Sequence, residues 1–322
     1  MPERLSPRDR AAAVARSTPA RLAITAILLG LLATQLDWST ALDRVRSGDP
    51  LWLAGAVLAV FTALAVAAWR WQRLLVSAEL PAGPRAVLRG YFMGAFANNF
   101  LPTGFGGDAV RALTVARPGP QLARAATTVL ADRLTSLACL LVLGWLVLPF
   151  DPGAVPGELV GLLAFGSAAA LAGAALVWAA ARSRALRARI PDRLRPIVSE
   201  MYQPLRVLAG DRPLIAQVTV LGLLYQAFIL LSVWLDARAI GLELPFALIA
   251  VTVPLVLVLT LLPVSLAGFG VREGSFAVLL GTAGVSATDA TLLSLTTVLT
   301  MAIASLPGAV AIVVGRGAQS DA

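Results

Sequence analysis

The sequence predicts an all-α integral membrane protein, a polytopic helical bundle with about six full spans and two interrupted apolar segments. Three observations lead to this prediction. The 322 residues are 58% hydrophobic and only 14% charged, and their mean hydropathy is +0.81. Several apolar runs are long enough to cross a hydrocarbon core ~30 Å thick at a rise of ~1.5 Å per residue. Arginines gather between these runs, as topology signals do.

Six uninterrupted apolar runs are the expected spans. They lie at about 22–36, 51–69, 125–148, 159–181, 214–235 and 290–314. The first run follows a basic segment, as the apolar part of a secretory signal would, but no small-residue cleavage site precedes Asp37. That favours an uncleaved span. We therefore expect a basic cytoplasmic segment at 1–21, one transmembrane domain at 22–315 and a short cytoplasmic tail at 316–322.

The placement of arginine predicts the topology, because cytoplasmic loops carry an excess of basic residues. Four segments are arginine-rich and expected inside, at 1–21, 70–89, 111–124 and 182–213. Three loops that are acidic or poor in arginine are expected outside, at 37–50, 149–158 and 236–245. This alternation places both termini in the cytoplasm. The eight arginines of 182–213 either set the topology or dock on anionic lipids of the inner leaflet.

Glycine and proline interrupt two further apolar segments. The first, at about 87–101, ends in a break that contains Pro102, and the second, at about 246–262, ends in a break that contains Pro263. Each break has Leu-Pro followed by Gly-Phe-Gly. The arginine pattern makes the first segment enter from the cytoplasm and return, whereas region 246–289 starts and finishes outside, as a re-entrant hairpin or as two short spans. Such paired interruptions are typical of an inverted repeat with a binding site at its interface; chance recurrence in an apolar chain is the alternative.

Charged and amide side chains beside the breaks form the candidate site. Non-helical backbone persists at membrane depth only where protein or a wet cavity surrounds it, and half-helix N-termini and arginines both suit a phosphate. We expect Arg111 and Arg272 to bind an anionic lipid headgroup, with Asn98 and Asn99 donating hydrogen bonds. The hypothesised headgroup site comprises Asn98, Asn99, Gly106, Gly107, Asp108, Arg111, Gly270, Arg272 and Glu273, supported by Pro102, Asp132, Arg133 and Pro263.

The acids of the candidate site allow more than one interpretation. Asp108 and Glu273 would hold the arginines, meet a cationic headgroup or carry a coupling proton. The structural alternative is a pure ion-pair staple between helices. Asp132 and Arg133 are adjacent, so on a helix they diverge by about 100° and need separate partners. For Arg133, snorkelling to the membrane interface is the simplest expectation.

The residue types present exclude several classes of function. The chain has no histidine, and all 26 basic residues are arginine. Histidine metal sites, Schiff-base lysines and a lysine-containing phosphate-binding loop are therefore excluded. The single cysteine, Cys139, permits neither an intramolecular disulfide nor a Cys-rich metal site. We therefore expect no metal and no cofactor. We also expect no nucleic-acid partner, because the arginines that give the net charge of +8 lie between apolar spans.

Three motifs resemble those of the lysylphosphatidylglycerol synthase transmembrane-region family, in order and over about 20–315. They read NNFLPTGFGGDAVR at 98–111, DR at 132–133 and LPVSLAGFGVREGSF at 262–276. The resemblance implies a multi-span bundle in the plasma membrane that moves or binds polar lipids. The matching motif positions are Asn98, Pro102, Gly106, Gly107, Asp108, Arg111, Arg133, Gly270, Arg272 and Glu273. Full-length synthases continue into a soluble aminoacyl-transfer domain, which is not found here, so synthase activity is not expected.

The sequence thus favours a lipid transporter rather than an enzyme. It would flip a polar phospholipid or glycolipid, with an anionic or zwitterionic headgroup, between the leaflets. A gradient, a partner or downhill scrambling would supply the energy. Two alternatives stay open: a membrane-embedded lipid-modifying transferase with Asp108 or Glu273 as base, and a non-catalytic scaffold of a lipid-modification pathway. A lipid-synthesising enzyme is a candidate partner.

Overall fold

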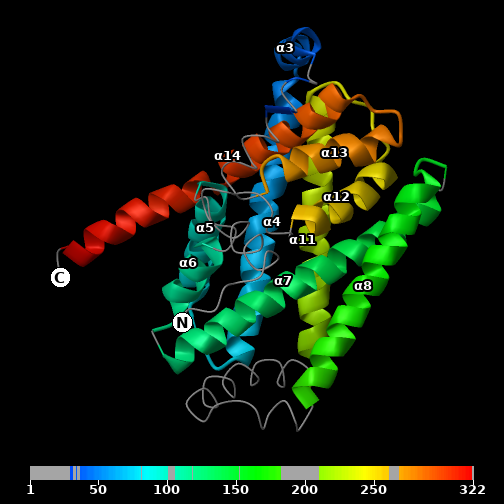
Figure 1. The fold of residues 1–322 in the computed structure, drawn as a ribbon. Helices are drawn as coiled ribbons and strands as arrows, with labels where there is room; N and C mark the ends of the chain where they lie inside the picture. Colours follow the sequence, from blue (N-terminus) through cyan, green and yellow to red (C-terminus); the bar gives the residue numbers. More distant parts are fainter. Residues whose placement is uncertain are drawn as a thin grey trace, which may run out of the picture.

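The chain forms a bundle of helices in the computed structural model (Figure 1). The structure describes residues 30–31, 34, 37–80, 82–100, 106–117, 119–151, 153–182, 210–260 and 268–320. These residues are mostly helical and include no strand, which confirms the predicted all-α class. Most of the expected first span at 22–36, and most of the arginine-rich segment 182–213, lie outside the described residues.

Five long apolar helices confirm five of the expected spans. They are α4 (Pro50–Ser77), α7 (Pro120–Val147), α8 (Gly157–Arg182), α11 (Arg212–Ala239) and α14 (Ala287–Ser320). Proline occupies the first turn of α4, α7 and α11, where its missing N–H has no helical partner to lose. Asp49 and Asp211 cap α4 and α11 by accepting from backbone N–H groups.

The shorter helices supply the connections and the two interrupted segments. They are α3 (Trp38–Arg46), α5 (Pro84–Phe100), α6 (Gly106–Val115), the 3-10 turn η1 (Leu148–Phe150), α12 (Phe246–Thr260) and α13 (Val271–Gly281). Both interrupted segments are therefore a helix, a break and a second helix. Pro102 and Pro263 fall in the breaks 101–105 and 261–267, outside the described residues.

One predicted boundary is wrong, and the error is informative. The sequence placed Arg70 in a cytoplasmic loop that follows a span ending at residue 69. In the structure α4 continues to Ser77, and Arg70 is completely buried within it. Arg70 interrupts the apolar pattern of the sequence but not the helix. The helix can continue because the carboxylate of Asp132 pairs with this buried arginine.

The first interrupted segment is an antiparallel hairpin of α5 and α6. Gly90 of α5 faces Thr114 of α6, and Gly94 faces Gly107. A Cβ built on Gly107 would lie 2.0 Å from the carbonyl oxygen of Gly94, so only glycine permits this approach. Both ends of the hairpin therefore lie at the same end of the bundle, which agrees with the predicted entry and return on one side.

The second segment, α12 and α13, starts from the opposite end of the bundle. Arg44 of the α3 loop donates to the carbonyl of Gly241, just before α12, and pairs with Asp289 at the start of α14 at 3.2 Å. The loops expected outside thus gather at one end. The break itself ends in two left-handed residues, Gly268 (φ 79°) and Gly270 (φ 82°), a conformation that favours glycine.

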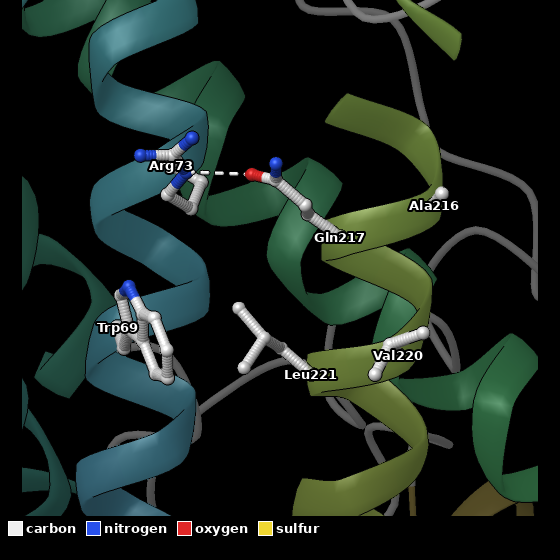
Figure 2. A pocket seen from close by; sticks show the side chains of 6 residues that line it. All are labelled: Trp69, Arg73, Ala216, Gln217, Val220 and Leu221. Carbon is white, nitrogen blue, oxygen red and sulfur yellow. Dashed lines mark hydrogen bonds between the residues drawn. The ribbon is translucent and has the colours of Figure 1, made fainter. Parts of the chain in front are cut away.

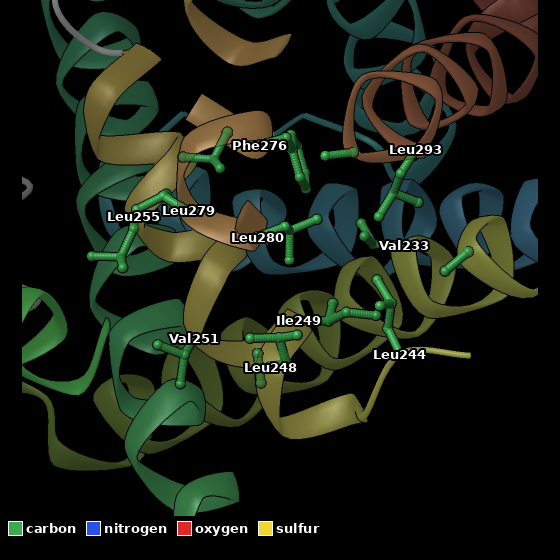
Figure 3. Close-up of a cluster of buried hydrophobic side chains, with 14 of the residues drawn as sticks. Val233, Leu244, Leu248, Ile249, Val251, Leu255, Phe276, Leu279, Leu280 and Leu293 are labelled. Atoms are coloured by element: carbon green, nitrogen blue, oxygen red, sulfur yellow. The ribbon is translucent and has the colours of Figure 1, made fainter. Parts of the chain in front are cut away.

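Two apolar clusters divide the core, and each includes residues of one interrupted segment. The first includes Trp71, Leu75 and Phe92 around α4, α5, α6 and α7. The second joins α11, α12, α13 and α14, where Leu280 and Leu293 lie among facing side chains (Figure 3). Helix α14 packs against both α5 and α13. It therefore links the two interrupted segments.

The contact between α14 and α5 predicts that alanine substitution at Gly308 and at Gly161 will have different effects on stability. A Cβ on Gly308 would lie 2.1 Å from the carbonyl oxygen of Phe92, whereas Gly161 of α8 has nothing within 4 Å. Gly308→Ala should destabilise the protein by at least ~1–3 kcal/mol through overpacking, while Gly161→Ala should be neutral or stabilising by up to ~1 kcal/mol. Thermal unfolding of the purified protein in detergent measures both. Equal midpoints for the two variants would contradict the described packing.

Candidate functional site

A buried carboxylate, that of Asp132 in α7, joins arginines from two other helices. Its Oδ1 accepts from Nε of Arg70 at 2.8 Å, and its Oδ2 accepts from Nη2 of Arg111 at 2.9 Å. None of the three side chains is more than 6% exposed. A buried charge costs several kcal/mol unless it is paired. The triad of Arg70, Asp132 and Arg111 therefore fixes α4, α6 and α7 against one another.

Aromatic rings hold both guanidinium groups of this triad in place. The Cζ atom of Arg111 lies 4.0 Å from the ring centre of Tyr91 and 4.5 Å from that of Trp71. The Cζ atom of Arg70 lies 5.2 Å from the ring centre of Tyr225. Rings at these distances attract a cation through their quadrupole and restrict the plane of the guanidinium. The arginines are thus oriented by their surroundings.

The triad retains unused capacity to bind an anion. Nη1 of Arg70 and Nε of Arg111 are buried without a hydrogen-bond acceptor among the described residues. The two guanidinium groups share the single carboxylate of Asp132, so the triad carries one excess positive charge. Buried donors are normally satisfied, and guanidinium groups recognise phosphate and carboxylate oxygens through paired N–H groups. The arrangement suits an oxyanion.

A second ion pair lies next to the triad. Asp108, in the first turn of α6, binds Nε of Arg133, and its Oδ1 lies 4.0 Å from Nη1 of Arg111. Asp132 and Arg133 therefore have separate partners, as their adjacency on a helix predicted. Arg133 binds Asp108 instead of only snorkelling to the interface, although its side chain is 37% exposed. The first break thus contains the ion-pair staple that was the structural alternative.

The two asparagines make hydrogen bonds within the protein. Oδ1 of Asn98 accepts from the backbone N–H of Gly107 at 2.9 Å, at the start of α6. Nδ2 of Asn99 donates to the carbonyl of Met301 at 3.2 Å and to Oγ of Ser305 at 3.1 Å. Asn98 therefore closes the α5–α6 hairpin, and Asn99 attaches it to α14. Gly106 precedes this contact as the first residue of α6.

The second break has its own acid and arginine. Glu273, only 1% exposed, accepts from the backbone N–H of Gly270 at 2.6 Å. Its carboxylate thus occupies the N-terminus of α13, the position that sequence reasoning reserved for a phosphate. Nε of Arg272 lies 3.4 Å from Glu273, and the Arg272 side chain is 25% exposed and lies against Phe269. Arg272 is the accessible cation of this break.

The structure divides the predicted residues into two groups. Asp108, Arg111, Asp132 and Arg133 come together at the first break, whereas Arg272 and Glu273 form a separate group at the second. Sequence reasoning missed Arg70, although the apolar residues after it continue the spacing of α4. It also missed Tyr91, which carries no charge and gave no signal. Within the described ranges, no three side chains of the histidine, cysteine, aspartate or glutamate type lie close enough to hold a metal ion.

An apolar recess of about 520 Å³ lies between α4 and α11 (Figure 2). Trp69 and Val220 are more than half exposed at this recess. Arg73 lies at its edge and donates from Nε to Oε1 of Gln217 at 2.9 Å. The recess is lined by Trp69, Arg73, Ala216, Gln217, Val220 and Leu221. Its size and apolar walls suit part of a lipid tail.

Comparison with known proteins identifies one family. The family model described as the lysylphosphatidylglycerol synthase TM region matches residues 20–308. The match includes both breaks and every residue of the buried triad. No curated protein sequence matches the chain.

The triad predicts a large loss of stability when its carboxylate is removed. Asp132→Ala leaves two buried guanidinium groups without their shared partner, so the free energy of unfolding should fall by ~3–5 kcal/mol. Glu243→Ala is the matched control, because it breaks the ion pair to Arg238 from a side chain that is 85% exposed. That variant should lose less than ~1 kcal/mol. Thermal or denaturant unfolding in detergent compares them, and similar stabilities would show that Asp132 is not essential to the core.

Proposed function

Because the chain belongs to the lysylphosphatidylglycerol synthase transmembrane-region family, we propose that it moves a polar lipid between the leaflets of the plasma membrane. The family match and the apolar spans make it an integral membrane protein with a lipid-related role. The observation that carries the proposal is the buried triad, with its excess positive charge and its two donors without acceptors. These features favour a lipid with a phosphate in its headgroup.

The triad offers a phosphate a defined set of contacts. Nη1 of Arg70 and Nε of Arg111 would donate to phosphate oxygens, and the phosphate would compete with Asp132 for the rest of the guanidinium N–H groups. The guanidinium N–H groups of Arg70 and Arg111 are buried in this structure. Helix α6, which carries Arg111, must therefore move for a headgroup to reach them. The α5–α6 hairpin is the natural moving part, since its two helices meet through glycine.

The predicted topology gives this process a direction through the bilayer. Arg70 lies seven residues before the end of α4, which is ~10 Å at ~1.5 Å per residue. With the termini in the cytoplasm, the triad would receive a headgroup from the inner leaflet. The headgroup would then pass towards Arg272 while the acyl chains stay in lipid, with the recess between α4 and α11 holding one of them.

The contacts of the two acids speak against the transferase alternative. A general base needs a carboxylate that can accept a proton from its substrate. Asp108 is bound by Arg133, and Glu273 caps the start of α13. Both carboxylates are thus committed to structural partners. We therefore propose a transporter and not an enzyme, with a lipid-synthesising enzyme as the partner that supplies its lipid.

Lipid translocation in proteoliposomes tests the proposal. Labelled phosphatidylglycerol, phosphatidylethanolamine and a neutral lipid without phosphate would be compared. Arg111→Ala and Arg272→Ala should lower the rate for the two phospholipids by roughly tenfold or more, because one charged hydrogen bond contributes ~1.5–3 kcal/mol. Arg46→Ala, which alters an exposed cation in the last turn of α3, should leave the rate unchanged.

Arg111→Lys separates a transport defect from a folding defect. Lysine preserves the charge beside Asp132 but loses the paired N–H geometry. We expect a smaller loss of thermal stability than in Arg111→Ala, together with reduced translocation. Wild-type rates in folded Arg111→Ala, Arg272→Ala and Arg111→Lys would overturn the site assignment, and would favour a scaffold role if the protein still supports lipid modification in cells.

A further inference from the structure

A third buried acid, Asp236, lies outside both breaks. It is near the end of α11, is completely buried, and accepts from Oγ1 of Thr300 at 2.6 Å through its Oδ1. Its Oδ2 is buried with no hydrogen-bond partner among the described residues. No arginine pairs with it there, in contrast to Asp108 and Asp132. This carboxyl group is therefore unlike the other buried acids.

Among the described residues, the surroundings of Asp236 offer an ionised carboxylate no countercharge, and Thr300 contributes only a neutral hydroxyl group. Helix α11 packs against α4, α7, α12 and α14. On the segments at this end, α4 has no charge between Asp49 and Arg70, α7 none after Arg133, α12 none, and α14 none between Asp289 and Arg316. The nearest charged groups have other partners: Asp49 caps α4, Arg238 binds Glu243, Asp289 binds Arg44, and Glu273 caps α13.

The energetic comparison favours the neutral acid. Burying an isolated carboxylate away from water costs far more than burying a neutral hydroxyl, and such groups take up a proton instead. The hydroxyl of Thr297 lies one turn before Thr300 on the same face of α14. It donates to the carbonyl of Leu293, so its oxygen keeps lone pairs that can accept from a protonated Asp236. Thr297 interacts with the Asp236 carboxyl group, so its oxygen is the candidate acceptor for that proton.

Helix α14, which contacts Asp236, also makes polar contacts to residues at both breaks. Along α14, Ser294 donates to Glu273 of the second break, Thr300 to Asp236, and Ser305 accepts from Asn99 of the first break. Ser294 and Ser305, eleven residues apart, lie on about the same side of α14, whereas Thr300 lies roughly 120–140° around the helix from them. A change at Asp236 therefore acts on the helix that contacts both interrupted segments.

We propose that Asp236 is a proton-binding site whose occupancy locks α11 to α14. Loss of the proton leaves an uncompensated carboxylate between the two helices, which then separate so that water can solvate it. Rebinding of one proton restores the packed arrangement. The proton site itself is inferred from the geometry of Asp236. Its role in transport rests on the proposed function, for which it identifies a proton gradient as the energy source.

Infrared difference spectroscopy tests the proton site without any lipid assay. The full-length protein in detergent at neutral pH should show the carbonyl stretch of a protonated carboxylic acid, and Asp236→Asn should lack it. Asp289→Asn, which alters an acid paired with Arg44, should retain it. Absence of the band from the wild-type protein, or its persistence in Asp236→Asn, would overturn the proposal.

A sodium arm distinguishes a proton from a metal cation. If Asp236 is ionised and holds sodium, sodium chloride should raise the unfolding midpoint of the wild-type protein relative to choline chloride, and should not do so in Asp236→Asn. The proton site predicts equal midpoints in both salts for both proteins. A sodium-specific shift that disappears in Asp236→Asn would contradict it.

Translocation under a pH gradient tests the coupling. In proteoliposomes, the wild-type rate should change severalfold when an imposed proton gradient is reversed, whereas the Asp236→Asn rate should not respond. An Asp236→Asn variant with the full wild-type response would refute coupling at this residue. If the wild-type protein moves no lipid at all, the transport function fails, while the infrared band still decides whether Asp236 holds a proton.

Discussion

The compensation of two buried arginines by one carboxylate is the interaction on which the rest of this bundle depends. Arg70, Asp132 and Arg111 belong to α4, α7 and α6, so their contacts fix these three helices against one another. Because the charges cannot be left unpaired in an apolar interior, the relative rotation of these helices is restricted. The α5–α6 hairpin then follows, since Arg111 anchors one of its helices.

The two breaks share a pattern but satisfy their polar groups differently. At the first break, an amide closes the start of α6 and the acids pair with arginines from α6 and α7. At the second, Glu273 closes the start of α13 and leaves Arg272 partly exposed. These polar groups at each break thus have hydrogen-bond or ion-pair partners within the protein. In the proposed transport cycle, a headgroup would compete with these contacts.

Helix α14 connects the two interrupted segments by packing against α5 and α13. Its hydroxyl groups contact Glu273, Asp236 and Asn99. In an apolar environment, hydroxyl groups can satisfy buried acids and amides without introducing charge. In the proposed proton site, the cost of an ionised Asp236 would act on this helix. Helix α14, which joins the two breaks, is therefore also the helix that protonation of Asp236 would affect.

The sequence by itself determined the membrane class, five of the described spans, the two interrupted segments and their entry from opposite ends. These properties depend on hydropathy, length and the local excess of arginine, all of which are readable along the chain. Only the tertiary structure showed that Arg70 is internal, that Asn99 binds α14 and that Asp236 meets Thr300 without a cation. Each of these facts depends on a partner 62 to 202 residues away, and helix rotation, which local patterns leave open, decides which side chains meet.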